Sequence, residues 1–370
     1  MMTFTTETRI AVANPRAVVD LLCEHIAEHG ATVSFAGDDV HVAFGPSRGR
    51  LSTGGGYLAV QAEAPDLNAL QEIKLSLASH IVEFASAETV PEIVWTGDGA
   101  DVDTPADFRV LTVRNVEALT PHMRRITFQG EDLARFDTLE ALHVRLFIPP
   151  PGLAEPVWPT LGRDGLLKLP VGDERPAVRK YTIRKIDVTA GTLQIDFVLH
   201  DDAGPGSAFA AHAKAGDRVG MAGPGGRGLR PAEWYAFLAD ETALPAVGRM
   251  LESLPVHARG VAVLEVESAA EEQLLTAPPG IEIRWLHRNG ARAGTTTLLQ
   301  DTFAAMAWPS EDVRLYLWAA MEHSSFKAVR AAARHHPRLH KDDCLIVSYW
   351  RLGIAEEQHA REKAAARPSD

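Results

Sequence analysis

The spacing of the apolar segments changes twice along this chain, and these changes constrain the fold more than any other feature. Up to about residue 97, two amphipathic helical stretches alternate with short strand-like runs. From about 106 to 228, six short runs with strand character follow one another with few helices, which is typical of a small Greek-key barrel. From about 232 onward, strands and helices alternate, which indicates a parallel sheet.

These changes predict a multi-domain α+β protein. Residues 1–97 are expected to form a small α+β domain, and residues 98–105 are polar, acidic and Gly-containing, as in a linker. A six-stranded Greek-key β-barrel is predicted at 106–230, and an α/β parallel-sheet domain at 231–357. Residues 358–370 form a charged tail.

Composition argues against several classes of function. The chain has 49 acidic and 37 basic residues, a net charge of −12, so we expect no nucleic-acid partner, which would need a basic face. Cys23 and Cys344 are too few for a disulfide framework or an ordinary iron–sulfur cluster, and free thiols favour a reducing compartment. With no apolar run of about 20 residues and no secretory leader pattern, we expect a cytoplasmic protein without a membrane span.

One segment of the predicted barrel has the residue types of a flavin site. Arg179–Arg184 (RKYTIR) fits the pattern R-x-Y-[ST]-x-R. A guanidinium can grip a phosphate through two hydrogen bonds, a tyrosine ring can stack on an isoalloxazine, and a threonine hydroxyl or amide can reach the ring nitrogens. By itself the hexapeptide is equally compatible with an exposed basic strand.

Further segments add to this pattern. Asp196–His200 (DFVLH) leads into Gly204–Ala208 (GPGSA), a Gly/Ser loop whose backbone amides suit a phosphate. Asp240–Ala246 (DETALPA) follows an apolar strand and opens a helix, and Thr242 is placed to cap that helix. No G-x-G-x-x-G follows this strand, so an ordinary dinucleotide fingerprint is absent.

In order and spacing, these segments resemble the siderophore-interacting protein family of ferredoxin reductase-like flavoenzymes. Trp318–Glu322 (WAAME) and Ser348–Gly353 (SYWRLG) extend the resemblance, which covers about residues 106–357. Asp201 and Gly206 depart from the glycine and alanine usual in the phosphate loop. Residues 1–97 resemble a small bacterial domain of unknown function.

The resemblance implies FAD in the barrel, an NAD(P)H-binding-like α/β domain, and reduction of ferric siderophores from Fe(III) to Fe(II), which releases the iron. The electrons would come from NADPH, NADH or a ferredoxin-like donor. Met321 stands where glycine is usual in the family, and its larger side chain would crowd an approaching nicotinamide, so the electron donor is left open. A general flavin or ferric-chelate reductase of the same fold is an alternative, as is a siderophore-binding protein with little catalysis.

The resemblance also carries a set of binding residues, while no catalytic residue and no resident metal are assigned. The cofactor-binding residues are Arg179, Tyr181, Thr182, Arg184, Asp196, Val198, His200, Gly204, Gly206, Ser207, Ala208, Asp240, Thr242, Ala243 and Trp350. The substrate-binding residues are Lys327, Arg330, Arg334 and Arg351.

The expected substrate is an anionic ferric siderophore, such as a catecholate complex. Lys327, Arg330 and Arg334 are spaced to share one face of a helix, which would attract such an anion. A merely solvated helix face explains the same spacing. In the first domain, Cys23, His25 and His29 have helical spacings that could suit a metal, but the helix also needs a buried face, and core packing explains Cys23 better. A packing role is an equal alternative for His80.

Overall fold

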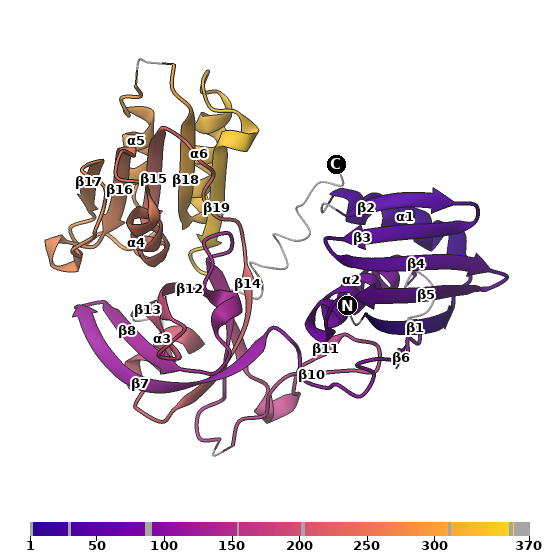
Figure 1. Ribbon diagram of the computed structural model, residues 1–370. Helices are drawn as coiled ribbons and strands as arrows, with labels where there is room; N and C mark the ends of the chain where they lie inside the picture. The colour runs from indigo at the N-terminus through magenta and orange to yellow at the C-terminus, as the bar shows by residue number, and fades with distance from the viewer. Residues whose placement is uncertain are drawn as a thin grey trace. The chain divides into compact units, whose positions relative to one another are not determined.

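The computed structural model describes residues 3–28, 31–85, 91–153, 155–200, 204–309, 312–354 and 358 (Figure 1). His29, Asp201 and all of the predicted tail except Gln358 lie outside the described residues. The chain forms two compact units. The first contains Met1–Phe108 and Pro150–Pro176, and the second contains Arg109–Pro149 and Ala177–Asp370.

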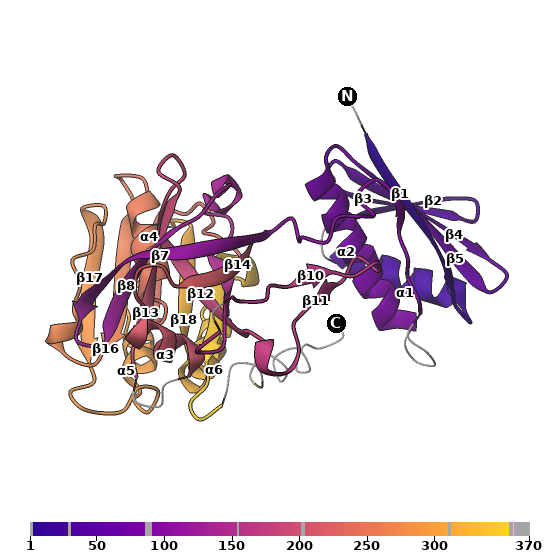
Figure 2. The same cartoon turned by 90° about the horizontal axis from the view of Figure 1, so that it is seen from below.

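The first unit is an antiparallel sheet with two helices against one face, as the violet elements of Figure 2 show. The strands are ordered β2-β3-β4-β5-β1-β6. Their bounds are β1 Phe4–Ala11, β2 Thr32–Ala36, β3 Asp39–Phe44, β4 Ser47–Gly54, β5 Tyr57–Ala64 and β6 Thr96–Gly97. Helices α1 (Pro15–Glu28) and α2 (Leu67–Ala85) bury their apolar stripes on this sheet. A Cβ on Gly49 would lie 3.3 Å from Leu77, so a glycine lets the sheet and α2 approach closely.

An excursion from the barrel sequence completes the first unit. It contains the strands β10 (Thr160–Leu161) and β11 (Leu167–Lys168) and the short 3-10 helix η2 (Gly172–Glu174). The indole Nε1 of Trp95 donates to the carbonyl of Asp164 at 3.0 Å, and Leu166 packs against the first core. Thus the range 106–230, predicted as barrel, includes residues 150–176 that fold with the first unit. Their Pro- and Gly-rich sequence has no periodicity to show this.

The second unit begins with the predicted six-stranded antiparallel barrel, which is confirmed. The closed barrel is ordered β12-β13-β8-β7-β14-β9. Its strands are β7 Phe108–Thr120, β8 Met123–Gln129, β9 His143–Ile148, β12 Ala177–Asp187, β13 Thr192–Val198 and β14 Arg218–Gly225, with helices η1 Ala134–Phe136 and α3 Pro205–His212. Phe128, Leu146 and Phe197 are fully buried in its core. Alternating apolar positions along the strands point their side chains inward.

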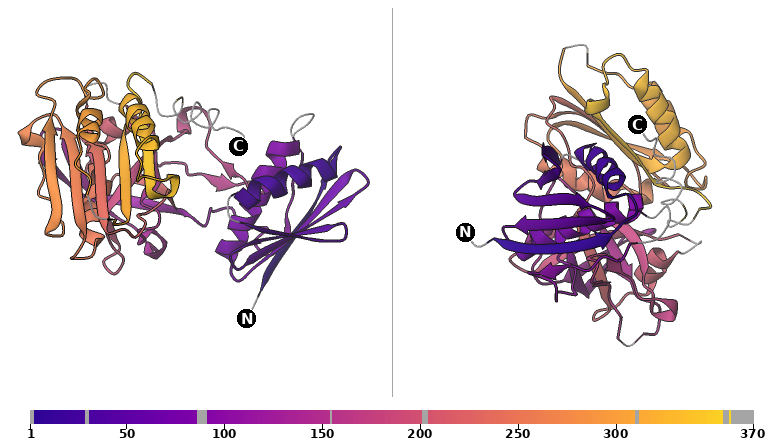
Figure 3. Two further views of the ribbon diagram at one scale, coloured as in Figure 1. Left: turned by 90° about the horizontal axis from the view of Figure 1, so that it is seen from above. Right: turned by 90° about the vertical axis from the view of Figure 1, so that its right-hand side faces the viewer.

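The predicted parallel sheet follows, in the order β17-β16-β15-β18-β19. Its strands, the orange-to-yellow arrows in the left view of Figure 3, are β15 Trp234–Asp240, β16 Arg259–Val266, β17 Gly280–His287, β18 Leu315–Glu322 and β19 Cys344–Trp350. The accompanying helices are α4 Leu244–Ser253, η3 Ala269–Glu271, α5 Leu298–Ala304, α6 His323–Arg334 and η4 Lys341–Asp343. One core lies on the α4 side of the sheet, and another lies on the side of α5 and α6.

The strand order of this sheet predicts where a ligand would bind. The chain passes from β15 through β16 to β17 on one side, and then returns to β18 and β19 on the other. Neighbouring strands β15 and β18 therefore flank a topological switch point. In open parallel sheets, ligands bind in the crevice at the carboxyl ends of the strands at such a point.

Within the second unit, the barrel and the parallel sheet share buried contacts. Arg184 on β12 forms two hydrogen bonds with Glu252 on α4, of 3.0 and 2.5 Å. The guanidinium of Arg249 donates to the carbonyls of Ile183 and Thr138, each at 3.0 Å. Met123 of the barrel is buried in the same core as α4. These contacts fix the end of the RKYTIR strand against the sheet domain.

Across the described residues, no helix is long and apolar enough to cross a membrane.

Candidate functional site

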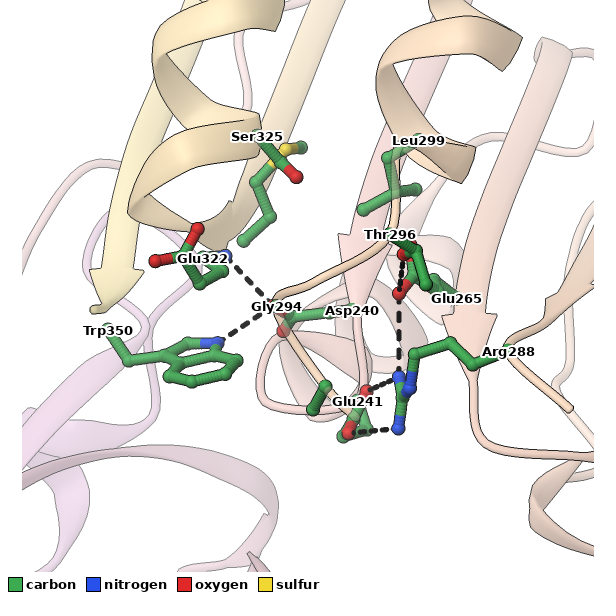
Figure 4. Close-up of a pocket in the computed structure, with 12 residues that line it drawn as sticks. Asp240, Glu241, Glu265, Arg288, Gly294, Thr296, Leu299, Glu322, Ser325 and Trp350 are labelled. Atoms are coloured by element: carbon green, nitrogen blue, oxygen red, sulfur yellow. Dashed lines mark hydrogen bonds and ion pairs between the residues drawn. The ribbon is translucent and has the colours of Figure 1, made fainter. Parts of the chain in front are cut away.

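The carboxyl ends of all five parallel strands meet around one small polar pocket, shown in Figure 4. Asp240 is the last residue of β15; its side chain is buried and lies at the centre of this pocket. One of its oxygens accepts hydrogen bonds from the amide and the hydroxyl of Thr242, at 3.0 and 2.5 Å. The other accepts from the amide of Glu322 at 2.9 Å and from the indole of Trp350 at 2.8 Å. One carboxylate therefore ties together β15, β18 and β19.

The predicted capping role of Thr242 is wrong. Helix α4 begins at Leu244 with Ala243 as its N-cap residue, and no side chain caps it. The hydroxyl of Thr242 donates to Asp240 instead, because the tight turn after β15 folds this side chain back toward the strand end. A helix does begin in this segment, but its N-cap residue is one position later than predicted.

Opposing effects act on the acidity of Asp240. Burial and the nearby charge of Glu241 raise its pKa, while the hydrogen bonds from Thr242 and Trp350 lower it. Burial prevails, so the pKa of Asp240 is raised to about 7. A buried carboxyl that titrates near neutrality at a strand end is a common feature of functional sites.

A second acidic side chain, Glu322, borders the pocket at the end of β18. One oxygen accepts from the amide of Ser324 at 2.5 Å and caps helix α6, and the other accepts from the amide of Leu352 at 3.1 Å. Burial alone would raise the pKa of Glu322, but the hydrogen bond from the Ser324 hydroxyl, together with these two amide bonds, outweighs burial and lowers it. Glu322 therefore stays ionised and holds both α6 and the chain after β19.

The opposite wall is an ion-pair cluster that sequence reasoning missed. Arg288, after β17, donates two hydrogen bonds of 2.7 and 2.8 Å to Glu241. Glu265 on β16 lies 3.6 Å from the same guanidinium and accepts from Thr296 at 2.8 Å. Burial raises the pKa of Glu265. Glu241 lies inside the DETALPA motif, but Glu265 and Arg288 have no local motif and are brought together only by the strand register.

The pocket walls are also closed by apolar and aromatic groups. The indole of Trp350 lies so close to Gly294 that an added Cβ there would be 2.9 Å from the ring. Gly294 has a φ of +77°, a conformation that favours glycine. Met321 has no exposed surface and lines the inner wall from the core of β18, α5 and α6.

In the barrel, the predicted flavin residues form a close-packed cradle. The Tyr181 ring packs on Phe197 with centroids 4.3 Å apart. A Cβ on Gly206 would lie 2.0 Å from the Tyr181 hydroxyl, so a side chain at this position would require the Tyr181 ring to move. The hydroxyl of Ser207 accepts from the backbone amide of His200 at 3.1 Å, which joins the end of β13 to the start of α3. Helix α3 has Gly204 as its N-cap residue, and the amides of Gly206 and Ser207, in its first turn, have no intrahelical acceptor.

Two predicted cofactor residues are buried and have ionic partners in the protein itself. Both oxygens of Asp196 pair with the guanidinium of Arg125, at 2.7 and 2.8 Å. Arg184 pairs with Glu252, as described above. These contacts give both residues a structural role, and their direct contact with a cofactor stays a prediction.

The remaining predicted residues lie at the edges of the barrel and the sheet. Arg179 is half-buried and donates to the carbonyl of Val178 at 2.8 Å. Val198 is half-buried beside the sheet core. Thr182 is buried and shares a hydrogen bond with Tyr349 of β19; loss of solvent raises the pKa of this tyrosine. Ala208 lies in the first turn of α3, where its amide donates to the carbonyl of Gly204.

The predicted basic face exists on helix α6. Lys327, Arg330 and Arg334 are all exposed, whereas Val329 on the opposite side is buried. The helix starts beside Glu322 at the pocket, so Lys327 lies about one turn from it. Arg351 is half-buried and follows Trp350 directly.

Comparison with known proteins decides the family. Residues 112–228 match the model of the siderophore-interacting FAD-binding domain, and residues 232–353 match that of siderophore-interacting protein. A crystal structure of a siderophore utilization protein from T. fusca is 39% identical, with a TM-score of 0.58, and covers 68% of this chain and 96% of its own. The chain belongs to the siderophore-interacting protein family.

Other members have names that describe their activity. Ferric vibriobactin reductase ViuB of Vibrio cholerae is 29% identical over 266 residues, which are 69% of this chain and 93% of that protein. The NADPH-dependent ferric-chelate reductase of Escherichia coli is 33% identical over 221 residues, covering 58% and 82%. The structure of the siderophore-interacting protein SipS from Aeromonas hydrophila is 33% identical, with a TM-score of 0.59, over 70% of this chain and 98% of that one.

The start of the chain lies outside both of these family matches. Residues 7–96 match a domain described as an uncharacterized protein conserved in bacteria. The resemblances predicted from the sequence are therefore confirmed for both parts of the chain.

The shifted acidity of Asp240 predicts a dependence of stability on pH. A carboxyl whose pKa is raised on folding stabilises the fold at low pH, and this contribution is lost as the pH rises through its folded pKa. The thermal midpoint of the wild type, relative to that of Asp240→Asn, should therefore fall between about pH 5 and about pH 8. Asp342→Asn, at an exposed site, is the matched control. A difference between wild type and Asp240→Asn that is constant over this range would contradict the raised pKa.

Proposed function

We propose that this protein is an FAD-dependent ferric-siderophore reductase that converts Fe(III) to Fe(II) with electrons from NADPH or NADH. One observation carries the proposal. Thr182, in the RKYTIR strand of the FAD-binding domain, shares a hydrogen bond with Tyr349. The residue after Tyr349 is Trp350, whose indole donates a hydrogen bond to Asp240 in the switch-point pocket. A short chain of contacts thus joins the predicted flavin strand to the predicted nicotinamide pocket.

The barrel residues fit a flavin dinucleotide. Tyr181 offers a half-exposed ring over Gly206, and the first turn of α3 offers amides to a phosphate. Arg179 offers a guanidinium from the same strand as the tyrosine. Tyr181, Thr182 and α3 would hold the group, while Arg184 and Asp196 would keep the barrel strands in register through their ion pairs.

The chemistry that FAD supplies when bound is the conversion of a two-electron transfer from a nicotinamide into single-electron transfers to Fe(III). The protein's own residues position the partners of this exchange. Both oxygens of Asp240 are already engaged within the protein, whereas the Glu322 oxygen that accepts from Leu352 keeps a second lone pair beside the pocket. Such an acceptor suits the hydroxyl and amide donors of a nicotinamide nucleoside better than its phosphates. Trp350 and Met321 limit the entry of water.

The electron donor is proposed as NADPH or NADH because the switch-point pocket lies in the family's second domain and because the Escherichia coli relative is named NADPH-dependent. A ferredoxin-like donor is a second candidate. It is favoured by Met321 and Trp350, which narrow the pocket that a nicotinamide would enter.

The substrate is proposed as an anionic ferric siderophore, including catecholate complexes. The exposed Lys327 lies about one turn from the start of α6 at the carboxyl edge of the sheet, and Arg330 and Arg334 continue this basic face along the helix away from that edge. Arg351 follows Trp350 at the carboxyl edge. In a protein with a net charge of −12, a local basic face favours anions at this place. The cytoplasmic location expected from the sequence remains a prediction.

The proposal is tested by anaerobic spectroscopy of the purified protein. We expect a yellow protein that NADPH or NADH bleaches, and whose colour a ferric siderophore restores. Retention of no flavin, or no reoxidation by the ferric siderophore, would contradict the proposal. Reoxidation by simple ferric chelates at the same rate would favour the general ferric-chelate reductase, and siderophore binding without any bleaching would favour the binding protein.

A glycine pair tests the flavin cradle. Gly206→Val should lower flavin content several-fold, because its branched side chain would displace the Tyr181 ring. Gly204→Val is the matched control, since a Cβ there meets nothing within 4 Å and the backbone amide is kept. Flavin absorbance per protein is the measurement, with circular dichroism to verify folding. Equal flavin content in the two variants would contradict the assigned cradle.

Charge reversal tests the basic face. Lys327→Glu should raise the KM for an anionic ferric siderophore several-fold at low salt and less at high salt, because screening weakens the attraction. Lys341→Glu makes the same change at an exposed lysine near the opposite edge of the sheet, and should leave KM unchanged. An equal effect of the two variants would show that α6 has no special role.

A further inference from the structure

Two histidines of the first unit lie together on neighbouring helices. His25 on α1 and His80 on α2 have ring centroids 5.0 Å apart, with planes inclined by 53°. Both side chains are half-buried, and Phe84 packs beside them, 5.8 Å from His25 and 6.3 Å from His80. The sequence placed these residues 55 positions apart, and only the packing of α1 against α2 brings them together.

The hydrogen bond made by Nδ1 of His80 shows which ring nitrogen has an available lone pair. Nδ1 of His80 lies 2.6 Å from the carbonyl oxygen of Ser76. A carbonyl can only accept, so Nδ1 carries the proton, and the neutral ring has its lone pair on Nε2. Histidines that bind metals almost always donate their other ring nitrogen to a carbonyl or carboxylate in this way.

The spacing of the two rings fits two ligands of one metal ion. With a metal–nitrogen distance of about 2.0–2.1 Å, adjacent imidazole ligands have centroids roughly 4.5–5.2 Å apart for angles between square and tetrahedral. Two imidazole ligands on opposite sides of a metal ion, as on the two faces of a haem, would have ring centroids roughly 6.4 Å apart. The observed 5.0 Å lies within the range for adjacent ligands.

We propose that His25 and His80 form a binding site for a divalent transition metal ion, with the remaining positions open to water or a small ligand. Imidazole suits Fe(II), Co(II), Ni(II) and Zn(II) better than Ca(II) or Mg(II). The identity of the natural ion rests on the proposed reductase function, which would release Fe(II) within the same chain. A site with two protein ligands would hold that ion as cargo and release it readily.

The residues of this site differ from the trio suggested by helical spacing alone. Cys23 is two positions from His25, so the two side chains leave α1 on different faces, and Cys23 is buried in the core. His80 takes its place as the partner of His25.

The test uses the full-length oxidised protein with Co(II), without nicotinamide or siderophore, so that its result is independent of reductase activity. We expect one Co(II) per chain with a ligand-field absorption band, and at least about tenfold weaker binding in His25→Gln and in His80→Gln. An excess of Fe(II) under anaerobic conditions should displace the Co(II), because Fe(II) binds such ligands more weakly than Co(II) does. Reductase rates measured with a ferrous chelator should be the same in these variants as in the wild type.

Two other histidines serve as controls. His41→Gln removes an exposed histidine of the first unit, on β3, and should leave Co(II) binding intact. His122→Gln removes the ring that lies 2.8 Å from both Glu267 and Glu271 in the second unit, where three potential ligand atoms also meet. Loss of Co(II) binding in His122→Gln, with retention in His25→Gln, would overturn the proposal.

A measurement on the wild type covers the case in which a variant does not fold. Diethyl pyrocarbonate modifies accessible histidines, and mass spectrometry locates each modified ring. Zn(II) should protect both His25 and His80, whereas the modification of His41 should not change. Modification of His25 and His80 at the same rate with and without Zn(II) would also overturn the proposal.

Discussion

The buried carboxylate of Asp240 is the interaction on which the site depends. It ends the central strand β15 and accepts hydrogen bonds from its own turn, from the amide that ends β18 and from the indole that ends β19. Because a buried carboxyl without partners is costly, these donors fix the strand ends around it. The switch point of the sheet thereby becomes a pocket of defined shape, with Glu322 and the Arg288 ion-pair cluster as its walls.

Contacts near the same edge of the sheet hold the barrel against the sheet domain. Thr182 contacts Tyr349, the residue before the indole that binds Asp240, and Arg184 is held by Glu252 of α4. Each of these contacts comes from the RKYTIR strand. The motif that suggested a flavin thus has a second role, since it joins the flavin-binding barrel to the sheet domain in one compact unit.

Sequence patterns predicted the barrel, the parallel sheet and the exposed face of α6, because strand alternation and helical spacing are local properties. They could not predict that Arg184 and Asp196 pair with Glu252 and Arg125, since those partners come from distant segments. The excursion 150–176 was missed for lack of periodicity. The proximity of His25 to His80 likewise depends on how two helices pack, which spacing along either helix cannot show.

The central claim is that electrons enter this protein in pairs and leave singly to siderophore-bound iron. The most direct measurement counts the Fe(II) trapped by a ferrous chelator when fully reduced protein meets excess ferric siderophore without oxygen. The account predicts about two Fe(II) per protein, as the protein returns to its oxidised spectrum. The Ga(III) complex of the same siderophore, which cannot be reduced, should leave the protein reduced. Reoxidation by the Ga(III) complex, or reoxidation without Fe(II), would contradict the account.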